Sequence, residues 1–317
     1  MDEAAHDLAQ LVRDELARAA PDAALRLADA IRKRVGPAVA AIVFYGSCLR
    51  KQTSEGVLDF YVLVDDYASA SSSRWLAWAG AALPPNVFYI ECQGDAETLR
   101  SKFAVVSVRD FARGAAPAGW RPGIWARFCQ PALAVYVRDA SARAALEEAC
   151  LQAILTAVRC IAPLLPAPAT AEQLWQAVFR ETYAAEMRTE HPETIRSLYQ
   201  ASTERYDLAL RGALVELETR GVASAKWTGN RFELELRPGA IPRAHRSWRL
   251  RRPVAKLVYV AQLLKTASTF GDWVPYALWK LERHTGTHIE YSERQRRHPF
   301  IWGWPLLFRV LRDRDLH

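Results

Sequence analysis

The chain has 317 residues, half of them apolar and about a quarter charged, a balance that excludes a disordered chain and leaves room for two domains. Its acidic, amphipathic first segment is unlike a signal peptide, and it has no uncharged apolar run of about eighteen residues, so we expect no membrane-spanning helix. The net charge of +7 is uneven: residues 243–317 carry +9 and residues 1–242 carry −2, which favours a polyanionic partner, either nucleic acid or anionic lipid.

The first 140 residues predict strands with helices between them. Apolar residues at helical spacing predict two helices within residues 2–35, which Gly36-Pro37 ends. Short apolar runs predict strands over 42–45, 58–64, 87–91, 103–108 and 132–137. A helix is predicted over 74–83, between the second and third of these strands. About five strands with intervening helices indicate a mixed sheet.

The remainder of the chain is mostly helical by pattern. We predict helices over 141–163, from Thr170 to about Thr189, over 193–218 and from Pro253 to Lys265, with Thr170 and Gln173 forming a capping box. Residues 226–234 predict a hairpin that turns on Thr228-Gly229-Asn230. The five cysteines form no Cys-x-x-Cys pair, so we expect free, buried thiols and no structural zinc site.

The most informative stretch is 41–66, in which a strand ends at Gly46-Ser47 and the next strand carries Asp59 among apolar residues. A carboxylate in a buried strand is costly unless a metal or a cation pairs with it. Gly46 allows a close approach of a ligand to the backbone, and N–H groups after Ser47 are suited to phosphate oxygens. This Gly-Ser turn, followed at this spacing by a strand aspartate, is typical of the nucleotidyltransferase fold of DNA polymerase β.

Two observations keep an alternative open. Asp59 could simply pair with Arg50 or Lys51. The wider superfamily has a second acid two residues after the first, on the same face of the strand, where this chain has Tyr61. A second acid must then come from elsewhere in the chain, or the site is degenerate.

The order of several short motifs resembles the soluble, mitochondrial-type phosphatidate cytidylyltransferases, the CDP-diacylglycerol synthases with a nucleotidyltransferase fold. The matching segments are Phe44-Tyr45-Gly46-Ser47, Leu58-Asp59-Phe60, Phe103 to Ser107, Trp125 to Pro131 and Tyr183 to Arg188. The resemblance spans about residues 40–215, and that family also lacks the second strand acid. It implies an α+β protein with a mixed-sheet nucleotidyltransferase domain over 1–140, an all-helical domain over 141–222, and a hairpin with a basic, aromatic-rich helical region over 223–317.

The implied reaction transfers CMP from CTP to phosphatidic acid, giving CDP-diacylglycerol and pyrophosphate with Mg²⁺ as cofactor. The resemblance makes Asp59 and Glu186 the catalytic and metal-binding acids, with Glu91 as a rival second ligand. It assigns the nucleotide to Gly46, Ser47, Arg50 and Lys51, and the lipid substrate to Tyr183, Arg188 and Arg127. The simpler interpretations are an intrahelical ion pair on a solvated face for Glu186, a structural salt bridge for Arg127 and a strand-end surface residue for Glu91.

The basic C-terminal quarter suits an enzyme bound to an anionic membrane. We expect Arg246, Arg249, Arg251, Arg252 and Lys256 to meet headgroups, and Trp248, Trp302 and Trp304 to lie at the interface. The alternative is that these aromatic residues belong to a core.

Three classes of function follow. The first is a cytoplasmic lipid cytidylyltransferase, peripheral on the inner face of a bacterial membrane. The second is a nucleotidyltransferase acting on RNA or protein, although the sequence shows no RNA-binding module and we do not expect nucleic acid as a partner. The third is a non-catalytic scaffold with this fold.

Overall fold

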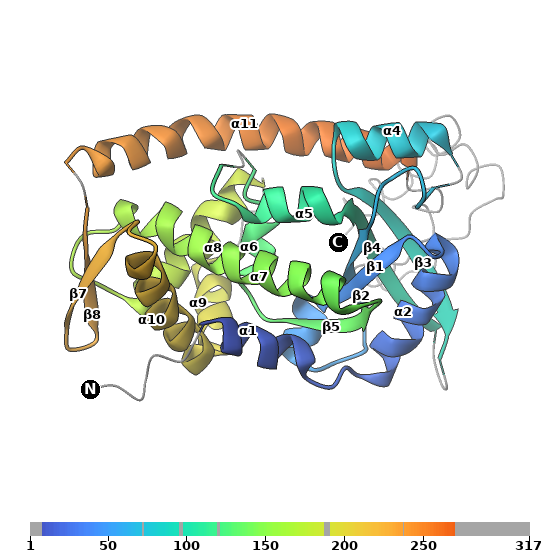
Figure 1. Ribbon diagram of the computed structural model, residues 1–317, viewed down its shortest axis with the longest axis horizontal. Coiled ribbons are helices and arrows are strands. Elements are labelled where there is room, and N and C mark those ends of the chain that lie inside the picture. The colour runs from blue at the N-terminus through green and yellow to red at the C-terminus, as the bar shows by residue number, and fades with distance from the viewer. Residues whose placement is uncertain are drawn as a thin grey trace, which may run out of the picture.

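The computed structural model describes residues 8–71, 73–94, 98–118, 121–186, 191–236 and 238–269. They form an α+β protein around a mixed five-stranded sheet of order β3-β4-β2-β1-β5 (Figure 1). Its strands are β1 (Val39–Tyr45), β2 (Val57–Val64), β3 (Asn86–Gln93), β4 (Thr98–Ser107) and β5 (Ala132–Val137). Strands β2 and β4 are parallel, whereas the other neighbours are antiparallel. The five strands and the mixed sheet confirm the prediction from the apolar runs.

Both faces of the sheet are apolar because successive side chains of its central strands alternate between two cores. Ile42 and Phe60 belong to one core, which α2 (Asp22–Val35) covers. Val43 and Leu63 point to the opposite, larger core. That core contains residues of α1 (Leu8–Ala17), α5 (Val108–Ala115), α6 (Trp125–Phe128) and α7 (Ala140–Ile161). The sheet is therefore a central layer between helices.

The helices after α7 continue this larger core. They are α8 (Ala171–Ala185), α9 (Pro192–Gln200) and α10 (Thr203–Thr219), and a short 3₁₀ turn (Ala162–Leu164) follows α7. The capping box of Thr170 and Gln173 is present at the start of α8. The helix predicted over 193–218 is instead two helices. A second sheet of order β6-β8-β7 joins β6 (Ala169–Thr170) to the predicted hairpin, β7 (Ser224–Thr228) and β8 (Arg231–Glu235).

The strand predicted over 103–108 differs at both ends, since β4 already begins at Thr98. The strand predicted to Val108 ends at Ser107, whose hydroxyl accepts a hydrogen bond from the Asp110 N–H and caps α5. Helix α3 (Ser47–Lys51) follows the turn at Gly46, and α4 (Arg74–Ala82) lies between β2 and β3, as expected. All five cysteines are free, as predicted, but Cys92 and Cys160 are only half-buried. None of the helices described is long and apolar enough to cross a membrane.

The last helix described, α11 (Ala240–Thr269), is much longer than predicted and lies along one edge of the molecule (Figure 1). The prediction started this helix at Pro253, which suits a first helical turn. Here Pro253 lies inside the helix, at the cost of one backbone hydrogen bond. The preceding residues were not recognised because they are dense in arginine and show no single apolar face.

Trp248 on α11 is buried, not at a membrane interface as the sequence suggested. Its indole N–H donates a hydrogen bond to Glu181 on α8 at 2.6 Å. Arg251 also points inward, since it lies over the Trp248 ring and donates to the Pro117 carbonyl. Trp302 and Trp304 lie outside the described residues.

Candidate active site

The turn after β1 holds its backbone directly against the carboxylate of Asp59. Gly46 has φ +93°, and a Cβ added there would lie 3.1 Å from Asp59 Oδ2. The antiparallel register pairs Tyr45 with Asp59, which places the turn and the acid side by side. The structure therefore brings together the glycine and the aspartate that the sequence singled out.

Asp59 forms an ion pair with a lysine that the sequence analysis did not select. Lys102 Nζ lies 3.3 Å from Asp59 Oδ1, and the parallel register of β2 and β4 sets the two residues opposite each other. Arg50, one of the expected partners, hydrogen-bonds to Gln130 at 3.4 Å, and Lys51 is exposed at the end of α3. In the sequence, Lys102 is only a cation next to an apolar strand segment. The sequence does not show which strands pair, so it could not predict that Lys102 lies opposite Asp59.

Ser47 is exposed in the first turn of α3, immediately after Gly46. Together with Arg50 and Lys51 it places a hydroxyl and two cationic side chains around the same turn. Their role in binding a nucleotide stays a prediction: the structure places them on α3, directly after Gly46, and none of them lines the cavity described below.

Tyr61, at the position of the second superfamily acid, is a core residue. Its ring is 4% exposed and meets Phe128 edge-on, with the ring centroids 5.1 Å apart. Burial raises the pKa of the Tyr61 phenol, so the hydroxyl stays neutral. The larger core occupies this position, and a carboxylate there would lose its hydration.

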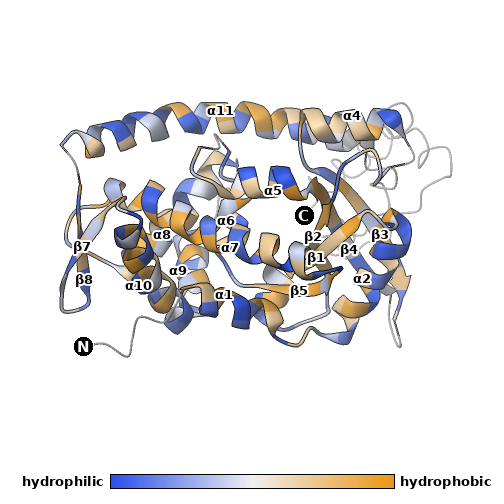
Figure 2. Ribbon diagram, viewed as in Figure 1, coloured by the Kyte–Doolittle hydropathy of each residue, from blue (hydrophilic) through white to orange (hydrophobic). Residues whose placement is uncertain are grey.

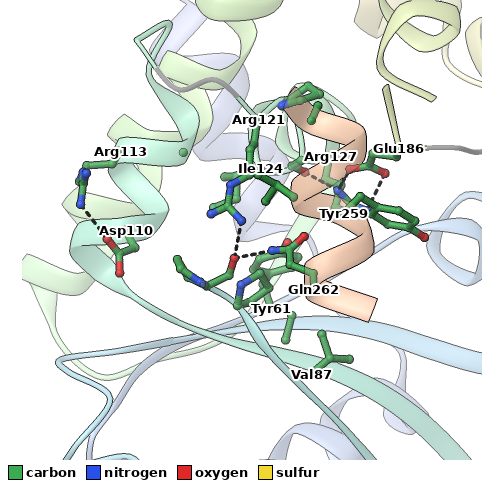
Figure 3. A pocket seen from close by; sticks show the side chains of 18 of the residues that line it. Tyr61, Val87, Asp110, Arg113, Arg121, Ile124, Arg127, Glu186, Tyr259 and Gln262 are labelled. Carbon is green, nitrogen blue, oxygen red and sulfur yellow. Dashed lines mark hydrogen bonds and ion pairs between the residues drawn. The ribbon is translucent and has the colours of Figure 1, made fainter. Parts of the chain in front are cut away.

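Glu186 ends α8 and forms a two-pronged ion pair with Arg127 of α6. Arg127 Nη1 and Nη2 donate to Glu186 Oε1 and Oε2 at 2.5 and 2.9 Å (Figure 3). Burial disfavours the guanidinium charge, but Glu186 overcomes this effect and raises the pKa of Arg127 well above its usual range. Both oxygens of the predicted second acid thus already have a cationic partner.

The other predicted ligands are placed differently. Glu91 lies on the edge strand β3, which β4 separates from β2, and accepts hydrogen bonds from Tyr89 of its own strand and from Arg100 of β4. Tyr183 is buried and stacks on Phe179 in the core, and it does not line the cavity described next. Arg188 lies outside the described residues.

A cavity of about 850 Å³ lies next to the Gly46 turn (Figure 3). Asp59 does not line it, but its strand neighbours Tyr45, Phe60 and Lys102 do. The sheet, α5, the segment before α6, the end of α8 and the inner side of α11 enclose it. Its walls are mostly apolar and include Pro84, Val87, Ile124 and Val258, while four cationic side chains line it: Lys102, Arg113, Arg121 and Arg127. Such a volume is sufficient for an organic ligand of moderate size.

The carboxylates of this cavity are both engaged by arginine. Asp110 pairs with Arg113 at 3.2 Å, and Glu186 pairs with Arg127. Arg121 differs, because its guanidinium donates to the Pro84 carbonyl at 3.0 Å and no carboxylate of the described residues pairs with it. Burial lowers the pKa of Arg121, yet a guanidinium remains charged at neutral pH. A half-buried cation without an acidic partner is suited to an anionic group of a ligand.

Asp59 is the side chain that fits a magnesium ion best. Mg²⁺ is commonly held by one or two carboxylates together with phosphate oxygens and water. Asp59 is a quarter exposed, lies at the phosphate-suited turn, and has one oxygen facing Gly46 and the other facing Lys102. The described residues contain no cluster of three His, Cys, Asp or Glu side chains. If Mg²⁺ binds here, Asp59 would supply a protein carboxylate, and substrate oxygens and water would complete the coordination.

No protein-family model matches this chain, and a search of curated proteins finds no match.

Proposed function

We propose that this chain is a nucleotidyltransferase that transfers CMP from CTP to phosphatidic acid, giving CDP-diacylglycerol and pyrophosphate. The observation that carries the proposal is the close approach of the Gly46 turn to Asp59, whose neighbours Tyr45, Phe60 and Lys102 line a cavity that combines apolar walls with arginine side chains. The choice of CTP rests on the resemblance of the sequence motifs.

The state of the cavity carboxylates favours an acceptor that is already anionic. A hydroxyl acceptor, as on RNA or a protein, needs a base to remove its proton. Asp110 and Glu186 both pair with arginine, so neither is free to act as that base. A phosphate monoester carries a charged oxygen at neutral pH and needs no such base. This argument favours a phosphate acceptor over the RNA or protein alternative.

The apolar lining favours a lipid among phosphate acceptors. Pro84, Val87 and Val258 offer apolar surface where a sugar phosphate would need hydrogen-bond partners. Arg121 and Arg127 line the same cavity and offer donors for the phosphate. Phosphatidic acid combines an anionic group with apolar chains and matches both features.

In the proposed reaction an oxygen of the lipid phosphate forms a bond to the α-phosphorus of CTP. The bond from that phosphorus to the bridging oxygen breaks, and pyrophosphate leaves with the electron pair. Asp59 would hold Mg²⁺, which neutralises charge on the triphosphate. Ser47, Arg50, Lys51 and Lys102 would position and neutralise the triphosphate, and Arg121 and Arg127 would orient the acceptor.

The geometry favours Glu186 as the residue that holds Arg127 in place, and its alternative role as a second metal ligand can be tested. If Glu186 binds the ion, Glu186→Gln will raise the Mg²⁺ concentration needed for half-maximal activity. If it only positions Arg127, the same variant will raise the KM for the acceptor and leave the Mg²⁺ requirement unchanged.

The test is pyrophosphate release with Mg²⁺, comparing four nucleoside triphosphates with and without phosphatidic acid in vesicles. We expect release only with CTP and phosphatidic acid together, and a loss of roughly two to three orders of magnitude in Asp59→Asn. Asp65→Asn is the matched control, because Asp65 follows the same strand but pairs with Arg138 at its far end.

A non-catalytic scaffold is the second candidate. It is favoured by Tyr61 in the core and by the ion pairs of Glu186 and Glu91, which leave Asp59 as the single candidate ligand. A folded protein that releases no pyrophosphate with any nucleotide and acceptor would support this candidate.

A further inference from the structure

Helices α4 and α11 expose large apolar side chains to solvent. On α4, Trp75 and Trp78 are 56% and 61% exposed and stack on each other with centroids 5.0 Å apart. On α11, Leu250, Leu257 and Leu264 are 55%, 72% and 71% exposed. These three leucines are spaced by seven residues, or about two turns, and share one side of the helix. We call these five residues the outer apolar face.

The opposite side of α11 is already buried against the protein. Ala255, Val258 and Gln262 line the cavity, and Trp248 is hydrogen-bonded to Glu181. An amphipathic helix on a soluble protein ordinarily has one apolar side. Helix α11 has two, and the orange apolar residues along it in Figure 2 alternate with blue charged ones rather than forming one stripe. Among the described residues, no part of the core covers this second apolar side.

The two helices lie along the same edge of the molecule (Figure 1). They are joined where α4 leads into β3: Lys265 of α11 donates hydrogen bonds to Pro85 and Asn86, and Gln262 donates to Pro84. The same two helices also line the cavity from within, through Ala81 and Ala82 of α4 and through α11. The outer apolar face is thus the outside of the cavity wall.

The charge of this edge is of one sign. Helix α11 contains seven lysine and arginine residues and no aspartate or glutamate, and α4 contains Arg74 and no acid. Of the seven, Arg251 and Lys265 point inward and Arg252 pairs with Glu181, so the remaining four supply the outward charge. Arg249 and Lys256 are exposed next to the exposed leucines in sequence. Exposed leucine and tryptophan flanked by basic residues match the polar and apolar layers of an anionic bilayer surface.

Two other occupants fit less well. A second copy of the chain related by two-fold symmetry would bring the same cationic helix against itself, without carboxylates to balance it. A nucleic acid would account for the arginines but would leave the exposed leucines in contact with water.

We propose that the outer apolar face of α4 and α11 docks on an anionic lipid bilayer, with Trp75, Trp78, Leu257 and Leu264 inserted at the interface. The proposal deepens the proposed function and rests on it in part, because it places the cavity wall on the membrane that holds phosphatidic acid. The proposal adds α4 to the membrane-binding surface. The sequence predicted that surface only in the C-terminal quarter of the chain.

The experiment is flotation of the full-length protein with vesicles of phosphatidylcholine alone and with added phosphatidylglycerol. We expect binding to the anionic vesicles, weaker binding at high salt, and a loss of roughly tenfold or more in Trp75→Ser/Trp78→Ser and in Leu257→Ser/Leu264→Ser. The control is Leu25→Ser/Val215→Ser, which removes exposed apolar side chains from α2 and α10 and should bind like wild type. Circular dichroism checks that each variant is folded.

Equal vesicle binding by all variants would overturn the proposal. Absence of vesicle binding by the wild type would also overturn it. In that case, loss of self-association by the variants in light scattering would identify a second copy as the occupant. Affinity for nucleic acid that the variants keep would show that these apolar side chains are not needed for that binding. Asp59→Asn separates this proposal from the proposed function, because it should lose nucleotidyl transfer and still bind vesicles. Vesicle binding without transfer by wild type would sustain the docking face and refute the activity.

Discussion

Gly46 combines a backbone conformation that favours glycine with a position close to the Asp59 carboxylate. Its φ of +93° disfavours any side chain, and a Cβ added there would lie 3.1 Å from Asp59 Oδ2, so that the Asp59 carboxylate would have to shift slightly. Gly36 provides a matched comparison, because it has φ +91° and nothing within 4 Å of an added Cβ.

We therefore predict that Gly46→Ala and Gly36→Ala will each destabilise the fold by about 1–3 kcal/mol, the usual cost of a strained backbone. Only Gly46→Ala should also lower activity, because its methyl group displaces Asp59. Urea unfolding and pyrophosphate release measure the two effects. Equal activity in both variants would show that the close approach to Asp59 has no role.

The Arg127–Glu186 pair gives a second prediction at the scale of residues. Removing one partner of a buried ion pair leaves a charge without compensation, so Glu186→Ala should lower the free energy of unfolding by about 3–5 kcal/mol. The double variant Arg127→Met/Glu186→Leu should recover most of this loss. Glu216→Ala, which breaks a more exposed pair with Arg220 on α10, should cost no more than about 1 kcal/mol. A single-variant cost as small as the control would argue against the pair as a structural support.

At the scale of elements, Lys265 fastens α11 to the segment between α4 and β3. Its ammonium donates hydrogen bonds to the Leu83 and Pro85 carbonyls and to Asn86. Burial, with a smaller effect of Arg121, lowers the pKa of Lys265 to about 8. In the unfolded chain the pKa returns to its usual value near 10.5.

Between these two values the unfolded state binds more protons, so this group makes stability rise with pH. We predict that the stability of wild type relative to Lys265→Met will increase from about pH 8 to pH 10 and stay constant below pH 7. Urea unfolding over this pH series is the measurement. Lys256→Met, at an exposed position of α11, controls for loss of a lysine from the same helix. A difference independent of pH would contradict burial of the ammonium.

At the scale of the whole molecule, a continuous core joins the sheet to the helices that follow it. Val43 and Leu63 of the sheet, Phe111 of α5 and Ile154 of α7 belong to one cluster that extends to Leu214 of α10. The division of the chain at residues 140 and 222 stays a prediction. What the core does establish is that the sheet face bearing Asp59 and the helix bearing Glu186 are held in a fixed relation.

The sequence by itself determined the local elements and the turn. Short apolar runs located the five strands, Thr170 and Gln173 specified a cap, and Gly46-Ser47 with Asp59 marked the candidate site, because each of these signals acts over a few residues. It misplaced the start of α11 at Pro253, since dense arginine hides helical spacing.

Only the tertiary structure decided which side chains meet. The pairing of β2 with β4 places Lys102 next to Asp59. The packing of α6 near the end of α8 brings Arg127 to Glu186. The position of α11 buries Trp248 and leaves Leu257 exposed. These contacts link residues far apart in the chain, and their register depends on the packing of whole elements. Local periodicity carries no information about that packing, which is why Arg121 and the cavity it lines were found only in three dimensions.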